Sequence, residues 1–132
     1  MTLVLDTSIL IDIERNNRDT INILKKIKED HPDTPYLTLI SHFEFLLGIK
    51  EKKPKNEEKA LNLLELFPVL STTKLTSKYL ADLKYKYDKK GLLLPLADLL
   101  IAAQVIENNM TFITKDKDFE RIEEINNKLI LI

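Results

Sequence analysis

Apolar and polar positions alternate along this chain in a way that predicts short buried strands separated by helices. Runs of branched and aromatic residues have the length of strands, and longer segments carry apolar residues at helical spacing. Strands that alternate with helices favour an α/β sandwich around a parallel sheet. The predicted strands are 3–5, 36–40, 69–70, 110–114 and 129–132, and the predicted helices are 9–14, 19–30, 41–50, 56–67, 73–90, 94–106 and a short one ending at 122.

Several predicted helices begin or end at residues that favour a helix terminus. Asp6-Thr7-Ser8 follows the first strand, and all three residue types are good N-caps. Ser41-His42-Phe43-Glu44 matches the S-x-x-E capping box, so we expect the third helix to begin at Ser41. Gly91 suits the end of the helix over 73–90.

The segment 94–106 is apolar on nearly every side, which is typical of a buried helix. Pro95 suits its start, because a proline there loses no hydrogen bond. One acid, Asp98, stands in its first turn with no basic residue nearby in the sequence. A buried, unpaired carboxylate is costly, so it must be paired, protonated or bound to a metal.

Composition adds limits on the class of protein. The 132 residues predict one domain over 1–132, and 44% hydrophobic with 31% charged residues is typical of a globular protein. A net charge of -1 excludes a strongly basic nucleic-acid binder but not a local basic face. The absence of cysteine excludes disulfides and cysteine zinc sites. No targeting or membrane-spanning segment is recognisable, so we expect a soluble, cytoplasmic protein.

Acidic residues follow the predicted strands and open the buried helix. Asp6, Glu44 and Asp116 come after strands, and ligands of open α/β sheets bind at the carboxyl ends of strands. The pattern can therefore bring these acids and Asp98 to one rim. Two carboxylates about 4 Å apart repel by roughly 4 kcal/mol at an effective dielectric of 20, so a proton or a cation must compensate. Hard oxygen ligands without cysteine favour Mg²⁺ or Mn²⁺ over zinc.

Four blocks of the sequence, in this order, resemble the motifs of PIN-domain nucleases, and the layout is similar to VapC-type ribonuclease toxins of type II toxin–antitoxin pairs. The resemblance implies a five-stranded parallel sheet flanked by helices in a three-layer sandwich. It also implies an Mg²⁺ or Mn²⁺ pocket, hydrolysis of RNA phosphodiester bonds, a homodimer and a small antitoxin partner. The blocks are Leu3-Val4-Leu5-Asp6-Thr7-Ser8 with Ile11-Asp12, Ser41-His42-Phe43-Glu44-Phe45, Asp98-Leu99-Leu100-Ile101-Ala102-Ala103 and Thr114-Lys115-Asp116-Lys117-Asp118-Phe119.

Carried onto this chain, the resemblance implies that Asp6, Glu44, Asp98 and Asp116 are catalytic and hold the metal ion. Many members of the family have Asn where this chain has Asp116, and Asp118 also stands nearby. We expect Asp116 to join the site, because it is nearer the strand end, and Asp118 to cap a helix or support the site. The expected supporting hydroxyl groups are Thr7, Ser8 and Thr114, with Asp12 on the outer face of the first helix.

Alternative functions remain open at this point. The chain can be an RNA-processing nuclease instead of a toxin, or a non-catalytic module that binds RNA or a partner. A phosphoacceptor regulatory domain is disfavoured, because Thr7 and Ser8 follow Asp6 where that scheme needs a second acid. Lysines over 50–55 and 84–90 are typical of solvated faces and can also contact RNA phosphates.

Overall fold

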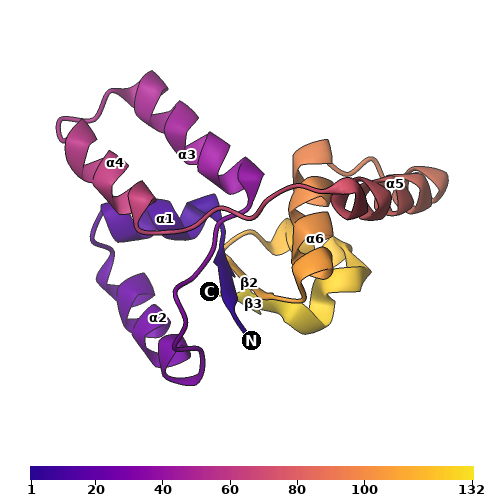
Figure 1. Cartoon of the computed structure of the whole chain (residues 1–132), viewed down its shortest axis with the longest axis horizontal. Helices are drawn as coiled ribbons and strands as arrows, with labels where there is room; N and C mark the ends of the chain where they lie inside the picture. Colours follow the sequence, from indigo (N-terminus) through magenta and orange to yellow (C-terminus); the bar gives the residue numbers. More distant parts are fainter.

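Short parallel strands occupy the middle of the molecule, as the computed structural model of residues 1–132 shows (Figure 1). β1 (Leu3–Leu5), β2 (Thr111–Thr114) and β3 (Leu129–Leu131) form a sheet in the order β1-β2-β3. Both pairs are parallel, with Val4 opposite Phe112 and Ile113 opposite Ile130. The predicted strands at 3–5, 110–114 and 129–132 are thereby confirmed.

The expected count of five strands is wrong, because the sheet has three. The segments predicted at 36–40 and 69–70 form only isolated parallel bridges, one joining Tyr36 to Val4 and the other joining Leu37 to Val69. The first segment leaves the extended conformation after Thr38, whose side chain already caps a helix. The parallel α/β architecture itself is confirmed.

Helices make up most of the rest of the chain, and the predicted ones all form. The helix predicted from Ser41 begins two residues earlier, because the hydroxyl of Thr38 accepts the N–H of Ser41 at 3.1 Å. The predicted capping box at Ser41 and Glu44 is therefore wrong. The elements are α1 (Thr7–Glu14), α2 (Arg18–Asp30), α3 (Leu39–Lys52), α4 (Glu57–Glu65), α5 (Lys74–Lys89), α6 (Leu96–Asn108), and two 3-10 helices, η1 (Lys117–Arg121) and the unpredicted η2 (Glu123–Lys128).

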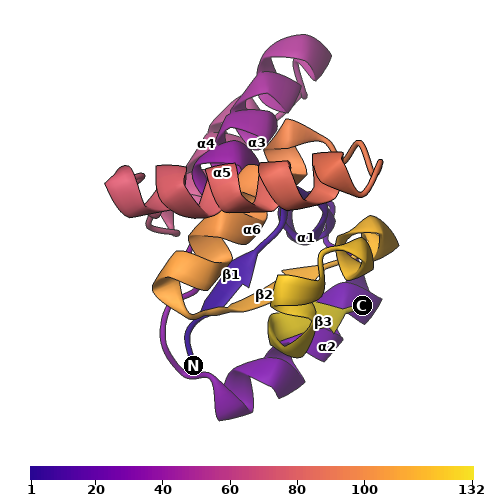
Figure 2. The same ribbon diagram turned by 90° about the vertical axis from the view of Figure 1, so that its right-hand side faces the viewer.

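The sheet separates two hydrophobic clusters, because successive strand side chains point to opposite faces. Val4 and Phe112 pack with α5, α6 and the 3-10 helices, whereas Leu3, Leu5 and Ile113 pack with α1, α3 and α4. Figure 1 shows α1 to α4 on one side of the strands and α5 with α6 on the other, and Figure 2 shows α5 crossing over α6. The three-layer sandwich follows from this alternation. No helix is long and apolar enough to span a bilayer.

A buried amide joins the two layers near the start of α3. Gln104 of α6 is fully buried, and its Oε1 accepts the N–H of Leu39 at 3.0 Å. Its Nε2 donates to the carbonyl oxygen of Leu70 at 3.2 Å. The side chain therefore fixes the first turn of α3, the helix that carries Glu44, against α6, the helix that carries Asp98.

Candidate active site

The carboxyl ends of the strands bring the predicted acids into one neighbourhood. Asp6 follows β1, Asp116 lies two residues beyond β2, Glu44 is in the second turn of α3 and Asp98 is in the first turn of α6. The charges of Asp6, Glu44 and Asp116 all raise the pKa of Asp98, and those of Glu44 and Asp116 also raise the pKa of Asp6, so these carboxyl groups gather around Asp98 and Asp6. The predicted convergence at one edge of the sheet is therefore observed.

Asp6 is the buried and most firmly held member of the group, since the residue is only 7% exposed. It is the N-cap of α1, as predicted, and its Oδ1 accepts the N–H of Thr7 at 2.9 Å. Thr114 donates to its Oδ2 at 2.6 Å. The hydroxyl of Ser8 donates to Oδ2 and that of Ser41 to Oδ1, each at 3.4 Å. Burial raises the pKa of Asp6 against these hydrogen bonds, and repulsion by Glu44 raises it further.

The hydroxyl of Thr114 links Asp6 to the loop that carries Asp116. It accepts the backbone N–H of Asp116 at 3.0 Å while it donates to Asp6. Asp116 in turn is the N-cap of η1, with its Oδ1 accepting the N–H of Asp118 at 2.9 Å. Of the two roles expected for Asp118, the helix cap is wrong, since Asp116 fills that position. Asp118 instead adds to the negative charge that acts on Asp98.

Glu44 is held by a hydroxyl from the neighbouring helix. Thr7 Oγ1 donates to Glu44 Oε1 at 2.8 Å, across the contact between α1 and α3. The hydrogen bonds predicted from Thr7, Ser8 and Thr114 to the candidate site carboxylates are all present. Ser41 was not predicted to contact Asp6, because its S-x-x-E spacing pointed to a capping role.

Asp98 carries the strongest sign of uncompensated charge. Burial in the first turn of α6 and repulsion by Asp116, Asp6, Glu44 and Asp118 raise its pKa to about 6. None of the four predicted site acids forms a salt bridge with a Lys, Arg or His side chain. Perturbed carboxyl groups without cationic partners are typical of sites that bind a cation or move a proton.

The donor set suits a hard divalent cation, since it consists of carboxylate oxygens and lacks thiolates. PIN-domain ribonucleases generally use divalent metals. No three Asp, Glu, His or Cys side chains are arranged so that they could hold an ion as they stand. Thr7 holds Glu44, and Asp116 is turned to the N–H of Asp118. Ligation by three of these carboxylates therefore requires side-chain rotation.

A further acidic residue, Asp12, binds the lysine that precedes Asp116. It was expected on the outer face of the first helix, but that expectation is wrong, because its side chain is only 12% exposed. Lys115 Nζ lies 2.8 Å from Asp12 Oδ2, and Thr20 donates to the same oxygen at 2.5 Å. Burial opposes ionisation, but these hydrogen bonds and the charge of Lys115 hold the pKa of Asp12 below its usual range. Because Lys115 precedes Asp116, this pair anchors the loop that carries a site acid.

Comparison with known proteins identifies the family to which this chain belongs. Residues 3–125 match the PIN domain family. The chain belongs to the PIN domain family. This PIN domain is 30% identical over 129 residues to Ribonuclease VapC1 of Methanocaldococcus jannaschii, covering 96% of this chain and 85% of the relative. It is 32% identical over 131 residues to Ribonuclease VapC of Rickettsia bellii, covering 95% and 93%.

Solved structures share the fold of this PIN domain. The crystal structure of VapBC2 from Rickettsia felis, bound to a DNA fragment from its promoter, matches with a TM-score of 0.78 and 25% identity. The alignment covers 100% of this chain and 98% of that chain. The relatives are ribonucleases and the structural neighbour is a VapBC complex, so the resemblance seen in the sequence motifs is confirmed.

Proposed function

We propose that this PIN domain is an endoribonuclease that uses Mg²⁺ or Mn²⁺ to hydrolyse RNA phosphodiester bonds. We further infer that it is the toxin of a VapBC-type toxin–antitoxin pair and acts in the cytoplasm, where its RNA substrate and a small antitoxin meet it. The observation that carries the proposal is the group of unpaired carboxylates at the strand ends, with the pKa of Asp98 raised to about 6. The VapC ribonucleases among its relatives support the reaction and the toxin role.

In this proposal the four acids bind the metal ion, and Asp6 among them also keeps the site rigid. Asp6, Glu44, Asp98 and Asp116 would hold the ion, directly or through water. A divalent cation bound there supplies positive charge for the phosphate oxygens and makes water a better nucleophile. Asp6 is fixed by its hydrogen bonds and gives the site a rigid base, whereas Glu44 and Asp116 are exposed enough to turn toward a ligand.

Hydroxyl groups around the acids hold the carboxylates in fixed positions relative to one another. Thr114 connects Asp6 to the backbone of Asp116, so the two acids stay in register across β1 and β2. Thr7 connects Glu44 to α1 at 2.8 Å. Such supporting hydrogen bonds orient metal ligands, and their loss typically weakens metal binding or activity.

A homodimer is implied by the resemblance, and the surface of α3 supports it. Leu39, Phe43 and Leu47 lie four residues apart on one face of α3, and Phe43 is 53% exposed. An exposed apolar stripe of this kind favours an interface between protein subunits. We therefore place the proposed dimer contact on this face.

The proposal is tested by RNA cleavage with the purified chain. We expect cleavage in Mn²⁺ or Mg²⁺ that leaves 5′-phosphate and 3′-hydroxyl ends, loss of cleavage in EDTA, and loss in Asp98→Asn. Glu65→Gln is the matched control, because Glu65 is exposed and makes no salt bridge. Cleavage that survives both EDTA and Asp98→Asn would reject the proposal.

One observation favours a second candidate, a non-catalytic PIN module that binds RNA. No three acidic side chains stand ready to hold an ion, which a pure binding module does not need. RNA that is retained by the protein but not cut at any Mg²⁺ or Mn²⁺ concentration would support this candidate. A toxin role is separated from RNA processing by expressing the chain with and without its antitoxin and measuring cell growth.

A further inference from the structure

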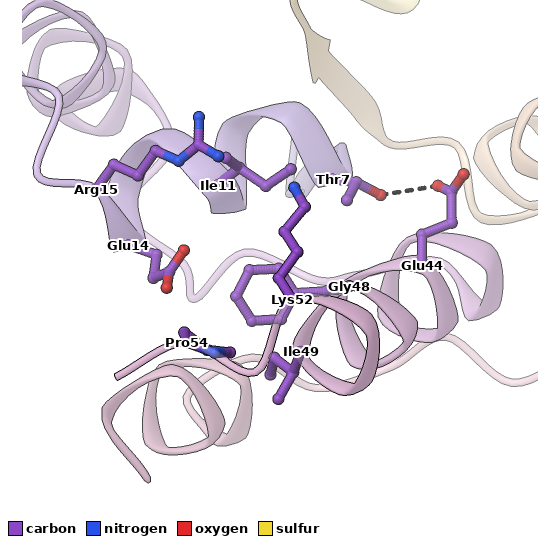
Figure 3. Close-up of a pocket in the computed structure, with 10 residues that line it drawn as sticks. Thr7, Ile11, Glu14, Arg15, Glu44, Gly48, Ile49, Lys52 and Pro54 are labelled. Atoms are coloured by element: carbon purple, nitrogen blue, oxygen red, sulfur yellow. Dashed lines mark hydrogen bonds between the residues drawn. The ribbon is translucent and has the colours of Figure 1, made fainter. Parts of the chain in front are cut away.

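A pocket of about 200 Å³ opens between α1 and α3, directly beside the acidic site (Figure 3). Thr7 and Glu44, which are hydrogen-bonded to each other, lie at one end of it. Glu44 also raises the pKa of Asp98, so the same side chain faces both the pocket and the other acids. A molecule that occupies the acidic site therefore has access to this pocket.

The body of the pocket is apolar and open. Ile11 of α1 and Phe45 with Ile49 of α3 line it. Gly48 lines it as well, and a Cβ built on this glycine would meet nothing within 4 Å. The missing side chain therefore leaves free space above α3, where a flat apolar group can lie against Ile11 and the small exposed parts of Phe45 and Ile49, which are 5% and 6% exposed.

Two cations stand at the rim of this apolar space. Figure 3 shows Arg15, at the end of α1, and Lys52, at the end of α3, extending toward the same part of the pocket near Ile11. Neither of them forms a salt bridge, so both charges are available to a ligand. Glu14 lies on the rim too, and it repels a phosphate but can accept a hydrogen bond from the amino group of a base.

We propose that this pocket binds one nucleotide of single-stranded RNA next to the phosphodiester at the acidic site, an inference that rests on the proposed nuclease function. Its base lies on Phe45, Ile11 and Ile49, and its phosphate pairs with Arg15 and Lys52. Proteins read single-stranded RNA by stacking unpaired bases on apolar and aromatic side chains or on arginine, and by pairing cations with phosphates. A base inside a duplex is not free to enter such a pocket.

The other lysine-rich surface of the molecule suits this task less well. On α5, Lys84 lies 2.7 Å from Asp88, and Lys86 lies 2.9 Å from Glu124. Lys90 lies 3.9 Å from Glu123. These lysines are already neutralised by acids, so they offer a phosphate less charge than Arg15 and Lys52 do.

The test is RNA binding measured by fluorescence anisotropy with a labelled single-stranded RNA octamer in EDTA. Gly48→Leu fills the pocket without changing its charge, so we expect about tenfold weaker binding, the scale of one lost base-stacking contact, with an unchanged salt dependence. Lys52→Gln should weaken binding and lower the slope of log K against log salt by about 0.7. Lys53→Gln is the matched control, because Lys53 is exposed but does not line the pocket.

The same set of variants distinguishes a loss of RNA binding from a loss of folding or of antitoxin binding. Gly48→Ala replaces a helical glycine and should raise the melting temperature while it weakens RNA binding less than Gly48→Leu does. A double-stranded octamer should bind wild type and Gly48→Leu alike. If the pocket variants bind the single-stranded octamer as wild type does, the proposal is wrong. If RNA binding is unchanged in this way and the pocket variants fail to bind a co-expressed antitoxin, the pocket binds the protein partner and not RNA.

Cleavage of the octamer by wild type in Mn²⁺ tests the proposed function separately. Cleavage without any effect of the pocket variants on binding or cutting would overturn this inference and keep the nuclease. Binding that depends on Gly48 and Lys52, without cleavage in any metal, would overturn the nuclease and keep the nucleotide site.

Discussion

Replacing Asp98 by asparagine should stabilise the folded chain at neutral pH. The pKa of this carboxyl is raised from 3.8 to about 6 in the fold. Since a pKa unit corresponds to about 1.4 kcal/mol, ionised Asp98 destabilises the folded state by up to about 3 kcal/mol. The side chain is only half-buried, so solvent screening reduces this to about 1–2 kcal/mol. Asparagine has the same shape and carries no charge.

The gain should depend on pH with a definite sign. The folded state binds the Asp98 proton more tightly than the unfolded chain, so wild type loses stability as the pH rises from about 4 through about 6. Asp98→Asn should therefore match wild type near pH 4 and exceed it by about 1–2 kcal/mol at pH 7 and above. Urea unfolding in EDTA at pH 4 and pH 7.5 measures both differences.

The control and the refuting outcomes are equally specific. Glu65→Gln removes an exposed acid and should stay within about 0.5 kcal/mol of wild type at both pH values. Saturating Mn²⁺ should stabilise wild type more than Asp98→Asn, because the ion binds the folded state. Equal stability of Asp98→Asn and wild type at pH 7.5, or a gain that persists at pH 4, would show that burial and the neighbouring acids do not raise the pKa of Asp98 in the fold.

Other substitutions test the supporting contacts. Thr114→Val should cost about 1–3 kcal/mol in urea unfolding and reduce cleavage, because Asp6 and the N–H of Asp116 lose their shared partner, whereas Thr114→Ser should retain both. Gln104→Leu should cost about 1–3 kcal/mol by thermal unfolding, because the buried carbonyl oxygen of Leu70 and the partly buried N–H of Leu39 lose their partner, and stability equal to wild type would contradict this reasoning. Phe43→Glu should convert the dimer to a monomer in light scattering without lowering the melting temperature of the monomer, and a monomeric wild type would refute the proposed contact.

The fold could be predicted from the sequence where one local signal dominates. Leu3–Leu5 and Thr111–Thr114 are short apolar runs, and both form buried strands. The segment 36–40 looked equally strand-like, but Thr38 turns it into a helix N-terminus by capping the N–H of Ser41. Both Thr38 and Ser41 could cap the helix by local sequence. The hydrogen bond of the Leu39 N–H to Gln104, 65 residues away, favours a helix that begins at Leu39 and is capped by Thr38. Local propensity does not contain this information.

The site could be predicted to the level of its acids but not of its supports. Strand ends and the first turn of a buried helix placed Asp6 and Asp98 correctly, because parallel strands share one carboxyl edge. Asp12 was misplaced, because its helical position alone does not show that Lys115 returns to it from 103 residues away. An acid in an otherwise apolar first helix, with a lysine beside a predicted site residue, is the signal that would have found this pair.

The pairing of β1 with β2 decides when during synthesis the acidic edge can exist. Asp6 is synthesised well before its main partner, because its shortest hydrogen bond comes from Thr114, 108 positions later in the chain. Until that hydroxyl emerges, β1 has no neighbour on the β2 side, and the loop that carries Asp116 is absent. A nascent chain therefore cannot assemble the complete acidic edge before Thr114 has emerged, and a chain truncated before residue 111 lacks that edge altogether.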